Sequence, residues 1–319
     1  MPEKASGPDT SYFLGFDGGG TKTECVLTNP EGEILVRVTA GPSNPLRTGY
    51  MRAWFSLSEA ADSVLARQKI KAGDISGVCA GLGGAGRPGV AKRITTFFDR
   101  SFPNAQVRVT TDLEIALEAA FGAGEGIILL AGTGSAAFGR DANGRTARVG
   151  GRGPWFSDEG SAFDIGRRAF AAVTRAEEHR APETALSQRL FRWHQAQSWD
   201  SLLERIAKNP DDVFPQTFPL VAQLADKGDA VCQGILDAAA ISLAELGAWV
   251  VKELGWRERE VRIAKVGGVH GRSKYLDAAI EAELKKAAPL ARLISLEMSP
   301  ADAAARMAIR SSRAKGNAA

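Results

Sequence analysis

Two glycine-rich stretches combine a permissive backbone with hydroxyl and basic side chains, a combination suited to binding phosphate. The first reads Asp17-Gly18-Gly19-Gly20-Thr21-Lys22-Thr23, and the second reads Ala131-Gly132-Thr133-Gly134-Ser135. Glycine permits positive φ and has no Cβ in the way, so neighbouring backbone N–H groups can point at one anion. Hydroxyl groups in both stretches add donors, and Lys22 adds a positive charge. Taken singly, each stretch is also compatible with an ordinary glycine-rich turn.

Three aspartates lie where strands are expected to end or helices to begin. Asp17 ends the first expected strand, where its carboxylate could hold Mg²⁺ directly or through water. Asp112 follows another expected strand and opens a helix. It is either the helix N-cap or a general base within reach of an attacking hydroxyl, and both interpretations stay open. Asp158 also opens an expected helix, so helix capping and a role in a binding site both stay open.

Three other segments have weaker local signals. Gly150-Gly151-Arg152-Gly153-Pro154 is dense in glycine, which indicates close backbone approach to a ligand or a mobile edge. Asn44 lies in a turn-forming stretch, and its local sequence favours a turn residue over a ligand. A nominal GxGxxG at Gly81-Leu82-Gly83-Gly84-Ala85-Gly86 has no acidic residue about 20 positions further on, so a tight exit from a strand is favoured over a dinucleotide site. The absence of GxxxxGK[ST] excludes a P-loop.

The elements around the first stretch are predicted as strand, glycine loop, strand, tight turn and strand, at Tyr12–Phe16, Glu24–Thr28 and Glu33–Thr39. The second stretch repeats this layout, with strands at Gly126–Leu130, Ala136–Arg140 and Arg145–Val149. Its Asn143-Gly144 pair predicts a type I′ turn. A repeat of about 115 residues indicates two related halves and not a solenoid. Two halves of one design usually enclose a cleft, where ligands bind.

The rest of the chain alternates strands and helices, which predicts an α/β fold. Helices are expected at Tyr50–Gln68, Val90–Asp99 and Leu113–Phe121, and strands at Gly77–Ala80 and Gln106–Thr110. From Asp158 to Leu254 the pattern is mainly helical, followed by a strand at Val261–Val266 and a terminal helix at Ala301–Arg310. Residues 1–12 are expected to be disordered, and Arg310–Lys315 to be a frayed basic tail.

Composition narrows the class of function. The chain has 319 residues, with 40 basic and 37 acidic side chains interspersed, so no electrostatic footprint for nucleic acid is expected. No run of 18 apolar residues occurs, which predicts no membrane-spanning helix. Cys25, Cys79 and Cys232 are far apart and form no CxxC pair, which argues against zinc and disulfides. We expect buried thiols and a cytoplasmic location.

The spacing of the motifs resembles a known family. Asp17–Thr23, Thr111-Asp112, Ala131–Ser135 and Asp158-Glu159-Gly160-Ser161, in that order, resemble the N-acetylglucosamine kinase family, which is grouped with the BadF/BadG ATPases in the actin–hexokinase–Hsp70 superfamily. The resemblance implies an α/β fold of two ribonuclease H-like (actin-like ATPase) domains, related by duplication, with a cleft between them. It implies an N-terminal domain of residues 13–122 completed by a helix at 300–312, and a C-terminal domain of residues 123–299 with a helical insertion.

The resemblance also implies a reaction and its residues. ATP and Mg²⁺ are the implied cofactors, and the 6-hydroxyl of an amino sugar, most simply N-acetylglucosamine, is the implied phosphate acceptor. The implied roles are phosphate binding by Gly19, Gly20, Thr21, Lys22, Gly132, Thr133, Gly134 and Ser135; Mg²⁺ positioning by Asp17; catalysis and sugar contact by Asp112; sugar binding by Asn44, Gly151 and Asp158; and adenosine binding by Ala225, Gly267 and Gly268.

Other functions stay open at this stage. The family often has Gly-Trp-Gly-His where this chain has Gly151-Arg152-Gly153-Pro154-Trp155-Phe156, so glucosamine and N-acetylmuramate remain alternative substrates. Dehydratase activators of the same superfamily bridge an iron–sulfur cluster with cysteines, and none of the three cysteines lies in a suitable loop. A non-catalytic sugar or ATP sensor is a further alternative, against which the three aspartates argue. A homodimer is compatible with the sequence.

Overall fold

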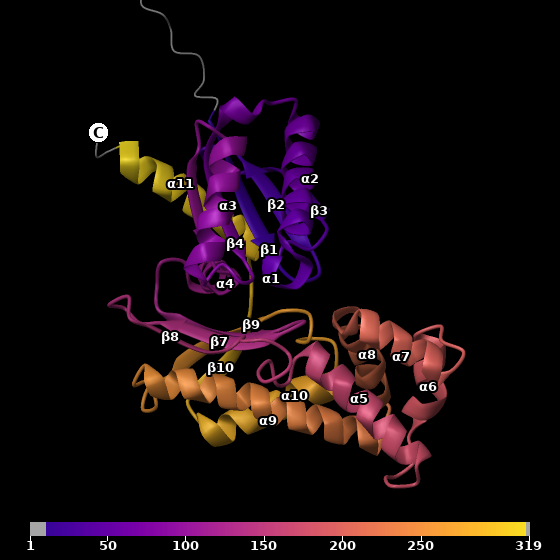
Figure 1. The fold of residues 1–319 in the computed structure, drawn as a ribbon. Helices are drawn as coiled ribbons and strands as arrows, with labels where there is room; N and C mark the ends of the chain where they lie inside the picture. The colour runs from indigo at the N-terminus through magenta and orange to yellow at the C-terminus, as the bar shows by residue number, and fades with distance from the viewer. Residues whose placement is uncertain (1–10, 317–319) are drawn as a thin grey trace, which may run out of the picture. The chain divides into compact units, whose positions relative to one another are not determined.

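The computed structural model describes residues 11–316, which form two compact units, each around one five-stranded sheet (Figure 1). Unit 1 comprises the described residues up to Ala123 and those from Glu297 onward, and unit 2 comprises Gly124–Leu296. Of the segment expected to be disordered, residues 1–12, the first ten lie outside the described residues, and Tyr12 belongs to a strand. The α/β fold class is confirmed.

The sheet of unit 1 has the strand order β3-β2-β1-β4-β5. The first three strands form an antiparallel meander, and β4 and β5 run parallel to β1. Parallel neighbours place their carboxyl ends at one sheet edge, so the loops after β1, β4 and β5 lie near one another. The strands are β1 (Tyr12–Gly18), β2 (Thr23–Thr28), β3 (Ile34–Ala40), β4 (Ile75–Leu82) and β5 (Gln106–Thr110).

The sheet of unit 2 repeats this topology, with the order β8-β7-β6-β9-β10. Here too the first three strands are antiparallel and the last two are parallel to the first. The strands are β6 (Gly126–Ala131), β7 (Ser135–Arg140), β8 (Thr146–Gly150), β9 (Val261–Val266) and β10 (Ala291–Ser295). The predicted repeat of strand, glycine loop and strand therefore extends to the whole sheet.

Matching hydrogen bonds strengthen the relation between the two halves. In unit 1 the N–H of Gly83, just after β4, donates to the last carbonyl of β1, that of Gly18, at 2.8 Å. In unit 2 the N–H of Val269, shortly after β9, donates to the last carbonyl of β6, that of Ala131, at 3.0 Å. In both units the glycine loop is thus fixed to the same neighbouring strand.

The helices of unit 1 are α1 (Pro45–Thr48), α2 (Tyr50–Gln68), α3 (Pro88–Ser101), α4 (Asp112–Phe121) and α11 (Pro300–Gly316), with a 3₁₀ turn η1 (Ala72–Asp74). Side chains alternate across a strand, so β1 has two apolar faces. Leu14 and Phe16 pack with α2 and α3, whereas Phe13 packs with α4 and α11. The sheet is therefore covered by helices on both faces.

The terminal helix α11 is longer than the sequence predicted. The segment expected to fray, from Arg310 on, continues the helix to Gly316. The Arg310 guanidinium donates to the Glu118 carboxylate of α4 at 2.6 Å, and that of Arg313 donates to the Pro30 carbonyl at 2.8 Å. The expected fraying is wrong because these contacts hold the last turns against unit 1.

Unit 2 is mainly helical after β8, as predicted. Its helices are α5 (Ala162–Glu177), α6 (Ala185–Trp193), α7 (Trp199–Lys208), α8 (Pro210–Ala225), α9 (Ala230–Glu253) and α10 (Lys274–Ala287). By length and composition, α9 is a helix that could cross a membrane, although no apolar run of 18 residues occurs in the sequence. It packs against the sheet, α8 and α10 in the core of the unit, as Figure 1 shows, and a buried core helix meets the same criteria.

Local details differ from the sequence prediction in unit 2. Neither α10 nor β10 was predicted. The turn at Asn143-Gly144 is not type I′, because φ is positive only at Gly144 (82°), and type I′ needs positive φ at both residues. The Asp141 carboxylate accepts hydrogen bonds from the N–H groups of Asn143 and Arg145, and these bonds set a different loop.

Candidate active site

The first glycine loop lies between β1 and β2 and is closed by its own backbone. The N–H of Gly19 donates to the Lys22 carbonyl at 3.0 Å, and the Gly19 carbonyl accepts from the N–H groups of Ser43 and Asn44, both at 3.1 Å. Thr21 and Lys22 are exposed at the tip, and the Lys22 ammonium lies 3.9 Å from the Glu24 carboxylate. The backbone hydrogen bonds thus hold a loop whose tip has an accessible backbone and a lysine cation.

The structure brings Asn44 and Asp112 together around Gly83. A methyl group at Gly83 would lie 2.9 Å from Nδ2 of Asn44 and 3.5 Å from Oδ2 of Asp112. Asn44 also acts locally as the N-cap of α1, because its side chain accepts the N–H of Leu46. Glycine leaves room here for the two polar side chains, and the nominal GxGxxG segment is the strand exit that we expected.

Asp112 is not the N-cap of α4. That position belongs to Thr111, whose hydroxyl accepts the N–H of Glu114 at 3.2 Å. The capping interpretation of Asp112 is therefore wrong, and the carboxylate lies on the first helical residue. The pattern Thr111-Asp112-Leu113-Glu114, a hydroxyl followed three residues later by glutamate, is the signal that could have identified the cap from sequence.

Asp17 lies in a strongly perturbed environment. Burial, together with the negative charges of Asp112 and Glu24, raises its pKa to about 7, against the lowering effect of Lys22. Two carboxylates thus influence one another at the carboxyl ends of β1 and β5. Perturbed carboxyl groups of this kind cluster at functional sites.

Arg47, which sequence reasoning missed, lies over the first glycine loop. A methyl group at Gly20 would lie 2.9 Å from Cδ of Arg47 and 3.6 Å from Nε. The guanidinium is brought there by the short helix α1 that follows Asn44. The loop therefore has a second nearby cation besides Lys22.

The second glycine loop lies between β6 and β7 and contacts three further segments of unit 2. The N–H of Gly132 donates to the Gly134 carbonyl at 2.9 Å, and the Gly132 carbonyl accepts the N–H of Ala162 at the start of α5. The Ser135 hydroxyl donates to the Glu159 carbonyl at 2.6 Å, so this donor is already used within the protein. Gly132, Thr133 and Gly134 keep accessible surface.

Asp158 packs directly against this loop. It is buried, with 3% of its surface exposed, and a methyl group at Gly134 would lie 2.7 Å from its Oδ2. It does not cap α5, because the N-cap is Ser161, so the capping interpretation is wrong. Its φ of 68° lies in the left-handed region, which aspartate adopts more readily than most non-glycine residues.

The remaining predicted residues of unit 2 have different surroundings. Gly267 and Gly268 are exposed, and Gly267, with φ of 99°, is so close to the second glycine loop that a methyl group would lie 3.0 Å from the N atom of Gly132. Gly151, with φ of 67°, is exposed beside β8. Ala225 is buried, and its carbonyl accepts from Gly228 and Gln233 at the end of α8.

The described residues fit a loosely coordinated Mg²⁺ better than a caged metal. Within residues 11–316 no group of three or more histidine, cysteine or acidic side chains could hold a metal ion. Mg²⁺ is usually held by one or two carboxylates together with waters and substrate phosphates. Asp17, beside Asp112 and the first glycine loop, is a donor of that kind.

Two units of one topology, each with a glycine loop after its first strand, define the class of the protein as an actin-like ATPase fold. The chain belongs to the BadF/BadG/BcrA/BcrD ATPase family, whose sequence model matches residues 14–304. ATP is therefore the nucleotide of its class.

Several proteins that are similar to this chain over nearly their whole length are named as kinases. The N-acetylmuramic acid/N-acetylglucosamine kinase of Clostridium acetobutylicum is 29% identical, covering 90% of this chain and 94% of that protein. The N-acetyl-D-glucosamine kinase of Dictyostelium discoideum is 28% identical, covering 94% and 98%. A solved structure from Chromobacterium violaceum, provisionally named an N-acetylglucosamine kinase, has a TM-score of 0.77 at 22% identity and covers 94% and 99%. The chain is an ATP-dependent kinase.

The three cysteines have no place in this site. Cys25 in β2, Cys79 in β4 and Cys232 in α9 are all buried, as predicted. Burial raises the pKa of the Cys79 thiol to about 12. A cluster-bridging activator needs accessible cysteines, so this alternative has no support among the described residues.

Proposed function

We propose that the protein transfers the γ-phosphoryl group of ATP to the 6-hydroxyl of an amino sugar, with N-acetylglucosamine as the leading substrate. The observation that carries the proposal is the grouping of Asn44, Asp112 and Asp17 at the carboxyl ends of the parallel strands of unit 1, next to a glycine loop. Ligands of α/β sheets bind at such strand ends. The names of the two relatives that match most of the chain support an amino sugar as acceptor.

In the proposed reaction Asp112 is the general base. Its carboxylate accepts the proton of the sugar hydroxyl as the hydroxyl oxygen bonds to the γ-phosphorus, and the bond from that phosphorus to the β,γ-bridging oxygen breaks, releasing ADP. Asn44, whose Nδ2 lies close to the same face of Gly83 as the Asp112 carboxylate, would hold a neighbouring sugar hydroxyl. Asp158 and Gly151 are the proposed sugar contacts of unit 2.

The two glycine loops are the proposed phosphate contacts. Gly19, Gly20 and Thr21 in unit 1, and Gly132, Thr133 and Gly134 in unit 2, would donate backbone and hydroxyl hydrogens to phosphate oxygens. Lys22 and Arg47 would offset the negative charge of the nucleotide. Gly267 and Gly268, which adjoin the second loop, are proposed for adenosine, together with Ala225.

Asp17 is the proposed residue for Mg²⁺. A bound Mg²⁺ neutralises charge on the phosphates during phosphoryl transfer. The carboxyl group of Asp17 must lose its proton to serve in this way, and the neighbouring negative charges that raise its pKa are the charges that a cation would balance.

A coupled ADP-release assay over a panel of hexoses and amino sugars tests the substrate class. We expect turnover with N-acetylglucosamine that exceeds turnover with glucose, and comparison with glucosamine and N-acetylmuramate would rank the alternatives. ADP release at one rate regardless of sugar would indicate an ATPase and refute the proposed acceptor.

The Asp112→Asn variant tests the base. The amide keeps the shape of the side chain but cannot accept the proton, so kcat is expected to fall about 10²–10⁴-fold while the protein stays folded. Circular dichroism would check the fold, and steady-state kinetics would check the rate. Wild-type turnover in this variant would rule out Asp112 as the base.

A further inference from the structure

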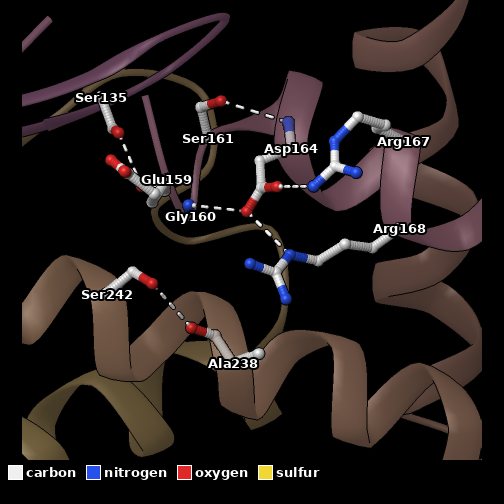
Figure 2. Close-up of polar contacts among 9 residues, drawn as sticks. All are labelled: Ser135, Glu159, Gly160, Ser161, Asp164, Arg167, Arg168, Ala238 and Ser242. Carbon is white, nitrogen blue, oxygen red and sulfur yellow. Dashed lines mark hydrogen bonds and ion pairs between the residues drawn. The ribbon is translucent and has the colours of Figure 1, made fainter. Parts of the chain in front are cut away.

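The turn that contains Asp158 is held by a buried ion-paired aspartate that the proposed reaction does not use. Figure 2 shows Asp164, in the first turn of α5, between this turn and two arginines. Its Oδ2 accepts the N–H of Gly160 at 3.1 Å and Nε of Arg168 at 2.9 Å, and its Oδ1 accepts from Arg167 at 3.0 Å. The carboxylate of Asp164 is thus the one group that connects the turn to both guanidinium groups.

The backbone of this turn has two residues with positive φ in three positions, Asp158 at 68° and Gly160 at 75°. Aspartate adopts the left-handed region more readily than most non-glycine residues, and neighbouring contacts then select this conformation. The contacts that hold the turn are specific. The Ser161 hydroxyl, at the N-cap of α5, accepts a hydrogen bond from the N–H of Asp164. The carboxylate of Asp164 in turn accepts a hydrogen bond from the N–H of Gly160. These two bonds close a ring across the turn.

Other segments enclose the same turn but bind it at different atoms. The Ser135 hydroxyl holds the Glu159 carbonyl, as Figure 2 shows, and the Gly160 α-carbon lies so close to α9 that a methyl group would be 2.7 Å from the Ala239 carbonyl oxygen. Neither contact reaches the N–H of Gly160. A backbone hydrogen bond also spans the turn, from the N–H of Ser161 to the Asp158 carbonyl at 3.2 Å. The carboxylate of Asp164 is the acceptor described for the N–H of Gly160, between these two residues.

We infer that Asp164 is a positioning residue, which acts through the backbone of Gly160 to keep the Asp158 carboxylate against Gly134. The inference rests on the proposed function in so far as Asp158 binds the sugar. Without the carboxylate of Asp164, the N–H of Gly160 loses its described acceptor, and one backbone hydrogen bond, from Ser161 to Asp158, is left to hold the turn together with its packing. The Asp158 carboxylate then leaves its place beside the second glycine loop.

The kinetic test is a double-mutant cycle between Asp158 and Asp164. Asp164→Ala is expected to raise KM for the sugar about 10–100-fold, the range for residues that orient a binding group. In an Asp158→Ala background the same change is expected to add at most about two-fold, because its target is gone. Fully multiplicative effects would show that Asp164 does not act through Asp158 and would overturn the inference.

Asp141→Ala is a matched control. Asp141 also fixes a turn by accepting two backbone N–H groups beside a glycine with positive φ, but this turn, between Asp141 and Arg145, contains no proposed site residue. We expect this variant to keep the wild-type KM for the sugar. An equal rise in KM in both variants would mean that general loosening of unit 2, and not the Asp158 turn, is responsible.

Amide hydrogen exchange tests the inference without any activity. In Asp164→Ala, the amides of Gly160 and Ser161 are expected to exchange about ten-fold faster, and in Asp141→Ala they are expected to be unchanged. If the wild-type protein phosphorylates no sugar, the proposed function fails while this measurement still decides the role of Asp164. Should Asp164→Ala not fold, Asp164→Leu, which has a similar shape and no acceptor oxygen, takes its place in both tests. Unchanged exchange in a folded variant would overturn the inference.

Discussion

The two polar side chains that we propose to bind the sugar, those of Asn44 and Asp112, both lie close to the α-carbon of Gly83. Gly83→Ala would insert a methyl group 2.9 Å from Asn44 and 3.5 Å from Asp112, closer to Asn44 than ordinary van der Waals contact. We expect kcat/KM for the sugar to fall about ten-fold or more, because a small displacement of positioned groups costs rate steeply. Steady-state kinetics with varied sugar would measure it.

Gly73→Ala is the control for this change, since a methyl group there would make only an ordinary contact, 3.6 Å from Asn104. Both variants should unfold at similar temperatures. A Gly83→Ala enzyme with unchanged kcat/KM would argue against a sugar site at Asn44 and Asp112.

The perturbed carboxyl group of Asp17 predicts how stability varies with pH. Its pKa is about 7 in the folded protein and ordinarily 3.8, so the folded state holds this proton more tightly than the unfolded chain. The stabilisation from that proton is present below about pH 4 and is lost as the pH rises through about 7. Asp17→Asn removes the titration. The variant should therefore gain stability relative to wild type between pH 4 and 8, by at most about 4 kcal/mol.

Urea unfolding of nucleotide-free protein in the presence of a chelator, at several pH values, would measure this difference. A difference between variant and wild type that stays constant from pH 4 to 8 would show that the Asp17 pKa is not raised. The same variant is expected to need more Mg²⁺ for activity.

At the scale of elements, the close packing of α11 on β1 is possible because Gly15 has no side chain. A methyl group at Gly15 would overlap the backbone of Ala301 and Ala305, which are fully buried. Backbone cannot move aside as a flexible side chain can, so Gly15→Ala is expected to destabilise the protein by about 1–3 kcal/mol or more. Chemical denaturation would measure the loss.

Gly89→Ala in α3 provides the comparison, because nothing lies within 4 Å of an added methyl group there. In a helix, alanine is favoured over glycine by about 0.5–1 kcal/mol, so this variant should be as stable as wild type or more so. If Gly15→Ala were equally well tolerated, the close packing of α11 on β1 would be incorrect.

Sequence patterns predicted the elements with strong periodicity and missed those decided by single contacts. The two meanders were predicted from apolar runs separated by glycine loops and turn residues, and α2 and the helical segment after Asp158 were predicted from their helical pattern. Capping by Asp112 and Asp158, one of the two interpretations left open for each, is wrong, since serine, threonine and aspartate are all good N-caps and the backbone decides which one caps. Asp164 was missed although Ser161-x-x-Asp164 resembles a capping pattern.

At the scale of the whole molecule, duplication explains why so much could be predicted. A single glycine loop is a weak signal, but its repetition with the same flanking strands indicated two related halves, and the two sheets have matching strand orders. What the sequence could not supply was proximity between distant segments. Arg47 over Gly20, Gly267 beside Gly132, and Asp158 against Gly134 depend on tertiary packing that no local pattern encodes.

The central claim is that the γ-phosphoryl group of ATP ends on an amino sugar and not on water. Phosphorus NMR of a reaction with ATP, Mg²⁺ and N-acetylglucosamine tests it most directly. We predict a sugar phosphomonoester, coupled to the C6 protons, that appears in step with ADP and forms about 10²–10⁴-fold more slowly with Asp112→Asn. ADP that appears together with inorganic phosphate alone would contradict the claim.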